Sequence, residues 1–169
     1  MGEYELQHTA VYNVFRFFPV TIILIVLILV ILFNDFKRPI IILLCIPMAM
    51  IGVISGLLLT GQAYTFVAII GTIGLIGMLI KNAIVLLDEI ERQLKEGNQP
   101  HNAIVNATIL RTRPVIMASA TTVLGMLPLL TDPMYGSLAV AVIGGLIVGT
   151  LITLVFVPIL YAIFYRVKT

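Results

Sequence analysis

Long apolar runs separated by short polar breaks set the pattern of this sequence. A helix needs about 20 consecutive apolar residues to cross the hydrocarbon core of a bilayer. Runs of about this length lie at residues 17–33, 40–59, 65–87, 114–130 and 138–164. Too little polar sequence remains to cover them, so the pattern predicts an all-α, polytopic transmembrane helical bundle with five spans.

The polar residues between these runs define the connections. Asn34–Pro39 ends the first span, and short turns at residues 60–64 and 131–137 follow the second and fourth spans. Residues 1–16 are predicted to form an extramembrane stub or linker, and residues 17–169 the transmembrane domain.

The longest polar stretch, at residues 88–113, is predicted to be a cytoplasmic connection. It is expected to hold the end of the third span and then a second short helix. Gly97 is typical of a helix end, and Asn98 and Pro100 are typical of a helix start.

The composition excludes a soluble domain. Hydrophobic residues make up 60% of the 169 residues and charged residues 11%, whereas soluble domains carry roughly 25% charged residues. The spans and connections use nearly the whole chain, so no second folded domain fits. Cys45 is the only cysteine, and His8 and His101 lie far apart. Neither a disulfide framework nor a metal site is predicted, and no cofactor is expected.

The basic residues indicate the orientation, because cytoplasmic loops carry an excess of lysine and arginine. If the spans alternate, Arg16 faces outward. Eight basic residues face the other side: Lys37, Arg38, Arg92, Lys95, Arg111, Arg113, Arg166 and Lys168. The sequence therefore predicts an N-terminus outside the cell and a C-terminus in the cytoplasm.

Lys81 is the most costly residue of the chain because it lies inside the third span. A lysine at the centre of a span costs about 2.5–3.5 kcal/mol, and less away from the centre. Gly71, Gly74 and Gly77 are expected on its face, where small residues allow close helix packing. We therefore expect Lys81 to point into a helical bundle, and Asn82 beside it favours a polar interior. The alternative is that the ammonium group reaches the cytoplasmic headgroups.

A buried ammonium group needs a carboxylate partner, or it loses its proton. Asp88 is on the same helix face as Lys81 but lies about 10 Å further along the helix. All acidic residues are at span ends or in connections: Glu3, Glu5, Asp35, Asp88, Glu89, Glu91, Glu96 and Asp132. The countercharge is therefore expected on another chain or on another part of a longer one.

Two interpretations are open for the hydroxyl groups of the fourth span. Ser119, Thr121 and Thr122 could bond back to carbonyls one turn earlier and help helices to pack. Alternatively, Ser119 and Thr122, three residues apart on one face, form part of a hydrated polar path near Lys81. Arg111, where the chain enters this span, is typical of a cytoplasmic anchor.

The sequence gives no sign of an enzyme. The glycine run Gly71–Gly77 lies in an apolar span, without the preceding strand or the spacing of a nucleotide-binding loop. No catalytic triad or zinc-protease motif is present. The net charge of +2 does not indicate binding to nucleic acid, so membrane lipid is the surrounding that we expect.

Three segments carry distinctive sequences: Gly71–Asp88 (GTIGLIGMLIKNAIVLLD), Arg111–Ser119 (RTRPVIMAS) and Leu124–Leu129 (LGMLPL). They closely resemble the C-terminal membrane half of resistance–nodulation–division (RND) efflux permeases. Asn34–Pro39 and Cys45–Gly52 match the two spans before them. The resemblance covers residues 12–168, the last five of twelve transmembrane helices, and favours the multidrug or metal branch over the protein-export relatives.

The resemblance implies a fragment of a proton-driven transporter of the bacterial inner membrane that exports drugs or other small amphiphilic compounds by antiport. It implies that Lys81 pairs with two aspartates in the N-terminal half of the permease and that Asn82 supports this lysine. Arg111 matches an arginine at the cytoplasmic end of the proton path. Ala118 replaces a threonine that the family commonly has, and Ser119 or Thr122 could take its role.

The resemblance also implies partners. These are the N-terminal half of the permease, two further copies in a homotrimer, a periplasmic adaptor and an outer-membrane channel. Residues 1–11 resemble the exit strand and linker of the periplasmic porter domain.

A non-transporting membrane scaffold is the alternative function. Such a protein would bind another membrane protein through its small-residue faces, which are Gly52 and Gly56, then Gly71, Gly74 and Gly77, and then Gly144, Gly145 and Gly149. Packing among the chain's own helices is the other explanation for these glycines.

Overall fold

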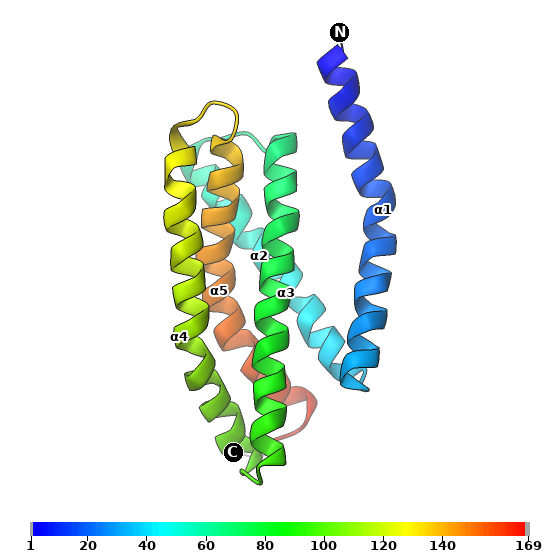
Figure 1. Cartoon of the computed structure of the whole chain (residues 1–169), viewed down its shortest axis with the longest axis vertical. Coiled ribbons are helices and arrows are strands. Elements are labelled where there is room, and N and C mark those ends of the chain that lie inside the picture. The colour runs from blue at the N-terminus through cyan, green and yellow to red at the C-terminus, as the bar shows by residue number, and fades with distance from the viewer. Residues whose placement is uncertain (1, 168–169) are drawn as a thin grey trace. The chain divides into compact units, whose positions relative to one another are not determined.

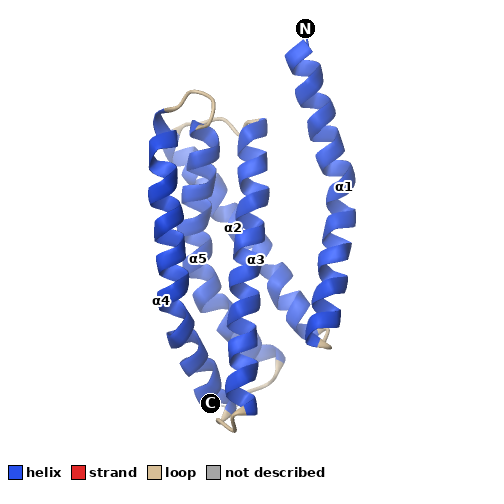
Figure 2. Ribbon diagram, in the orientation of Figure 1, coloured by secondary structure: helices blue, strands red, loops and turns tan. Residues whose placement is uncertain are grey.

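The computed structural model describes residues 2–167, and for residues 3 and 4 the backbone alone. This part of the chain is helical and contains no strand (Figures 1 and 2). The helices are α1 (Gly2–Phe33), α2 (Lys37–Thr60), α3 (Phe66–Lys95), α4 (Pro100–Met126), the 3-10 helix η1 (Leu127–Thr131) and α5 (Gly136–Phe164). Each α-helix is long and apolar enough to cross a membrane. The prediction of an all-α bundle with five spans is confirmed. Lys168, one of the basic residues used for the orientation, lies outside the described residues.

The chain divides into two compact units, one ending at Ile40 and one beginning at Ile41. In the first unit, the predicted break after the first span ends α1. Asn34 has a left-handed backbone (φ 47°), and its N–H donates to the carbonyl of Val30 at 2.8 Å. Asp35 then accepts a hydrogen bond from the N–H of Lys37 at 3.1 Å, which caps the start of α2.

The beginning of α1 differs from the prediction. The resemblance predicted a strand and linker at residues 1–11, but residues 2–11 are helical, and Met1 lies outside the described residues. Between Gly2 and Pro19 no proline or further glycine interrupts the helix. The Thr9 hydroxyl donates to the carbonyl of Glu5 at 2.8 Å, in keeping with helical backbone here. The expected strand is therefore wrong.

In the second unit, α3, α4 and α5 run side by side, and α2 crosses them obliquely (Figure 1). Buried apolar side chains of α2, α3 and α5 form the core: Ala49, Val53, Leu57, Ala68, Leu75, Leu79, Val140, Ala141 and Leu146. In hydrocarbon, backbone polar groups must bond within the chain, so apolar runs of this length become helices. The core then fixes the positions of α3 and α5.

Glycines bring the backbones of α2 and α5 into direct contact. A Cβ atom added at Gly52 would lie 2.9 Å from the carbonyl oxygen of Gly144, and one added at Gly144 would lie 3.0 Å from the Cα of Gly56. Side chains at these positions would force the helices apart. Close approach of small residues gains van der Waals contact between helices in lipid, so these glycines are used inside the chain.

In the connection between α3 and α4, the predicted helix end at Gly97 and helix start at Pro100 are confirmed, whereas one further prediction is wrong. α3 continues beyond Leu87 to Lys95, and the chain then turns at Gly97, which has φ 89°. α4 begins at Pro100 and continues through Pro114 as one helix, so the prediction of a separate short helix is wrong.

Packing explains both extensions. Buried positions continue along α3 at helical spacing through Ile90 and Gln93. The first turns of α4 bury Ala103, Ile104 and Ala107. This burial holds the segment before Pro114 in helical conformation, although the proline removes one backbone donor.

We predict that Gly144→Ala destabilises the chain, because its new methyl group would overlap the backbone of α2. Overpacking of this kind costs about 1–3 kcal/mol. Gly125→Ala is the matched control, since nothing lies within 4 Å of a Cβ atom there. The free energy of unfolding, measured by denaturant titration in detergent, should fall for the first variant and not for the second. Equal stability of the two variants would contradict this packing.

Candidate functional site

Lys81 lies on a face of α3 that the other described helices of the second unit leave open. Its side chain is exposed, and it has no ion-pair partner among the residues that the structure describes. Gly77 and Gly74, four and seven residues earlier on the same face, are also exposed, and a Cβ atom on either would meet nothing within 4 Å. The charge is therefore next to an unoccupied strip of small residues.

The other two residues of this predicted cluster point elsewhere. Gly71 is buried, and a Cβ atom there would lie 3.0 Å from the side chain of Leu138 on α5. Neighbouring residues on a helix point about 100° apart, so Asn82 lies on a different face from Lys81. Its side chain is half-buried. The predicted packing strip is thus divided between an internal contact at Gly71 and the open face at Gly74 and Gly77.

Ser119 is buried between α4 and α5. Its hydroxyl oxygen lies 2.9 Å from that of Thr150, and either can be the donor. Thr122 lies at a half-buried position, and its hydroxyl donates to the carbonyl of Ala118 at 3.0 Å. Ser119 thus joins two helices, whereas Thr122 bonds within its own helix. Ala118 is exposed.

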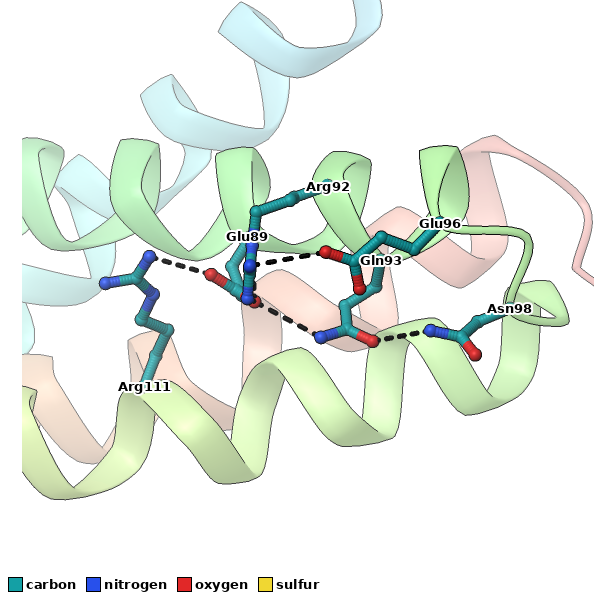
Figure 3. A network of polar contacts seen from close by, with 6 residues as sticks. All are labelled: Glu89, Arg92, Gln93, Glu96, Asn98 and Arg111. Carbon is teal, nitrogen blue, oxygen red and sulfur yellow. Dashed lines mark hydrogen bonds and ion pairs between the residues drawn. The ribbon is translucent and has the colours of Figure 1, made fainter.

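Arg111 belongs to a network of polar contacts between α3 and α4 (Figure 3). Its Nη2 donates to Oε2 of Glu89 at 2.7 Å. On the same carboxylate, Oε1 accepts hydrogen bonds from Arg92 Nε at 3.2 Å and from Gln93 Nε2 at 3.3 Å. Asn98 donates to Oε1 of Gln93 at 2.7 Å. The side chain of Glu89 is only 3% exposed, so the network surrounds a buried anion.

Glu89 lies beyond the apolar run that ends at Leu87, in the charged part of α3. The pKa of its carboxyl group is lowered to about 2, chiefly because Arg92 donates hydrogen bonds to it. Burial acts in the opposite direction and raises the pKa, while hydrogen bonds from Gln93 and Arg111 lower it further. Glu89 is therefore ionised at physiological pH.

Sequence reasoning missed Glu89 because it assigned every acidic residue to a span end or a connection. A signal was present in the periodicity. The buried positions Leu79 and Leu86 continue at helical spacing to Glu89 and Gln93. If the helical spacing of buried positions in the third span is continued for two more turns, Glu89 falls on the buried face.

Within residues 2–167, no three His, Cys, Asp or Glu side chains gather in a way that could hold a metal ion. The polar residues described above lie at three places: the open face around Lys81, the hydroxyl pair at Ser119, and the network around Glu89.

Known proteins share both the sequence and the fold of this chain. Residues 1–165 match the AcrB/AcrD/AcrF family. The crystal structure of a heavy metal efflux pump, crystal form II, superposes with a TM-score of 0.84 at 30% sequence identity over 98% of this chain. Crystal form I of a heavy metal efflux pump gives a TM-score of 0.78, also at 30% identity and 98% coverage.

The chain spans 17% of the length of each matched pump chain. The match nevertheless extends over nearly all of the chain and agrees in sequence and in fold. It confirms the predicted relationship to RND permeases. This multi-pass membrane chain belongs to the AcrB/AcrD/AcrF family of efflux transporters.

Proposed function

We propose that this chain supplies the C-terminal transmembrane helices of a proton-driven RND efflux permease, in which Lys81 is the fixed cation of the proton relay. The family match supports a role in efflux. The chain matches only a part of a longer pump, which leaves room for a countercharge outside it.

The open position of Lys81 is the observation that carries the proposal. An ammonium group facing hydrocarbon is costly, and a carboxylate partner offsets that cost. Gly74 and Gly77 leave space beside Lys81 for a closely packed helix, because neither has a side chain. A helix bearing carboxylates, from the N-terminal half of the permease, would fill the strip and neutralise the charge.

This geometry suggests how proton transfer could move helices. While the facing carboxylates are ionised, they attract the ammonium group of Lys81 and hold α3 against the partner helix. A proton that binds a carboxylate removes its charge and weakens the attraction. Release of that proton to the cytoplasm restores the ion pair. One cycle of attraction and release thus accompanies each proton that crosses.

Asn82 and Arg111 have supporting roles in this proposal. Asn82 is half-buried beside Lys81 on α3 and is proposed to support the polar surroundings of the lysine. Arg111 keeps a positive charge where the path reaches the cytoplasm, at the end of α3 that carries Glu89. Ser119 bonds to Thr150 and Thr122 to Ala118, and each hydroxyl oxygen can still accept a further hydrogen bond within a polar path.

The remaining parts of the proposal concern the complete permease. We propose a homotrimer in the bacterial inner membrane that acts with a periplasmic adaptor and an outer-membrane channel. Drugs or other small amphiphilic compounds are the proposed substrates, exchanged for protons. Heavy metal ions, which the matched pump is described as exporting, are the alternative substrate class.

The scaffold function is less well supported. Gly52 and Gly144 contact each other inside the chain and are not free to bind another protein. Gly74 and Gly77 could serve a scaffold as well as a permease, but a scaffold gives no reason for a lysine beside them. Export by the complete parent permease would exclude a non-transporting scaffold, and the first experiment below then tests the role of Lys81.

We predict that Lys81→Met in the complete permease lowers efflux by about 100-fold or more, because it leaves buried carboxylates without their countercharge. Lys95→Met is the matched control, since Lys95 is exposed on the same helix and pairs with Glu91 at 3.0 Å. Ethidium and Zn²⁺ serve as probes, and the one that the parent permease exports is measured. Both variants should reach the membrane at the parent level. Retained efflux in Lys81→Met would refute the relay role.

We also predict that Gly77→Leu affects the permease and the isolated chain differently. In the isolated chain the new side chain enters open space, so the free energy of unfolding in detergent should change little. In the complete permease it would displace the partner helix and abolish efflux. Normal efflux in the Gly77→Leu permease would show that no helix packs on this strip.

A further inference from the structure

The network around Glu89 lies outside the lysine relay, although its members come from the same helix. Glu89 is eight residues beyond Lys81, which is about 12 Å along α3 at 1.5 Å per residue. The two side chains point in different directions, because that of Lys81 is exposed whereas that of Glu89 is only 3% exposed. A buried carboxylate requires compensating donors, and their arrangement shows what Glu89 can do.

The two carboxylate oxygens of Glu89 have separate partners. Oε1 is bonded by Arg92 and Gln93, which belong to α3 itself. Oε2 is bonded by Arg111, which belongs to α4. Donors within α3 therefore occupy one oxygen and leave the other directed at the neighbouring helix.

One of the two donors at Oε1, the side-chain amide of Gln93, is itself fixed in orientation. Asn98, in the turn after α3, donates to the side-chain oxygen of Gln93. The nitrogen of the Gln93 amide must then point towards Glu89. This chain of bonds runs from Asn98 in the turn through Gln93 to the carboxylate of Glu89 (Figure 3).

Arg111 depends on Glu89 for its position. Among the described residues, Glu89 is its ion-pair partner, and Nε of Arg111 is buried without a hydrogen bond. Only the bond at Nη2 therefore fixes the guanidinium group, whose side chain is 33% exposed. Arg92, in contrast, also pairs with Glu96 at 3.3 Å. Loss of Glu89 would free Arg111 more than it would free Arg92.

We infer that Glu89 is a positioning residue for transport, which holds the Arg111 guanidinium group in place between α3 and α4 at the end of α3 that is predicted to be cytoplasmic. This inference rests on the proposed function of the chain. Glu89 does not carry the proton itself. It fixes the site of a positive charge, and it joins α4 to the helix that carries Lys81.

A double-mutant cycle in the complete permease tests this role, with maximal efflux rate and half-saturating concentration of the exported probe as readouts. Glu89→Gln should lower the maximal rate by about tenfold, because a buried donor and acceptor pair loses its charge. The half-saturating concentration should stay unchanged, since Glu89 is not proposed to touch substrate. In an Arg111→Gln background, Glu89→Gln should cause no further loss, because it acts through Arg111.

Glu91→Gln is the matched control. Glu91 also lies on α3 and pairs with a basic residue of the same helix, Lys95, but it does not reach Arg111 in the structure. Its substitution should leave the maximal rate at the parent value. If Glu89→Gln lowers the amount of permease in the membrane, the Arg111→Lys variant is measured in its place. Lysine keeps the positive charge of Arg111 but not the geometry of its guanidinium group. The same loss of maximal rate is then expected.

Two results would overturn the inference: a Glu89→Gln rate per molecule equal to that of Glu91→Gln, or losses that add in the double variant. A loss with Lys81→Met but none with Glu89→Gln would remove the positioning role and leave the relay intact. Full efflux in Lys81→Met would instead remove the proposed function.

Discussion

The position of one ammonium group governs this account. Lys81 lies within an apolar helix, and the other described helices of the second unit leave its face open. The free energy of a charge in hydrocarbon falls when a carboxylate packs against it, and Gly74 and Gly77 leave the space for a helix to bring one. The fold therefore has an unsatisfied electrostatic requirement at the same place as an unoccupied packing surface.

The rest of the second unit makes α3 a rigid support for that charge. Its buried side packs on α5 through Gly71 and the apolar core, and its far end is joined to α4 through Glu89 and Arg111. α2 is held against α5 by direct backbone contact at Gly52 and Gly144. A force on Lys81 would therefore act on several helices together. This mechanical connection is what an ion pair needs in order to drive a conformational change.

The sequence predicts the helical class and the spans well, because long apolar runs in lipid have no other stable conformation. It also predicts a role for Lys81, since a charge within such a run is costly, and that role stays a proposal. The helix ends are predicted less well. Burial of Gln93 and Ala107 extends two helices through segments whose composition suggested a connection. Glu89 was missed for the same reason, because its burial depends on α4 packing against α3, and local composition does not report that contact.

The distance between Nζ of Lys81 and the nearest carboxylate oxygen in a complete permease tests the central claim most directly. An experimental structure in lipid at neutral pH should place a carboxylate from outside this chain within about 4 Å of the nitrogen, the usual limit for an ion pair. The same structure should show a helix packed on Gly74 and Gly77. A Lys81 side chain extended to the headgroup region, with lipid covering those glycines, would contradict the account.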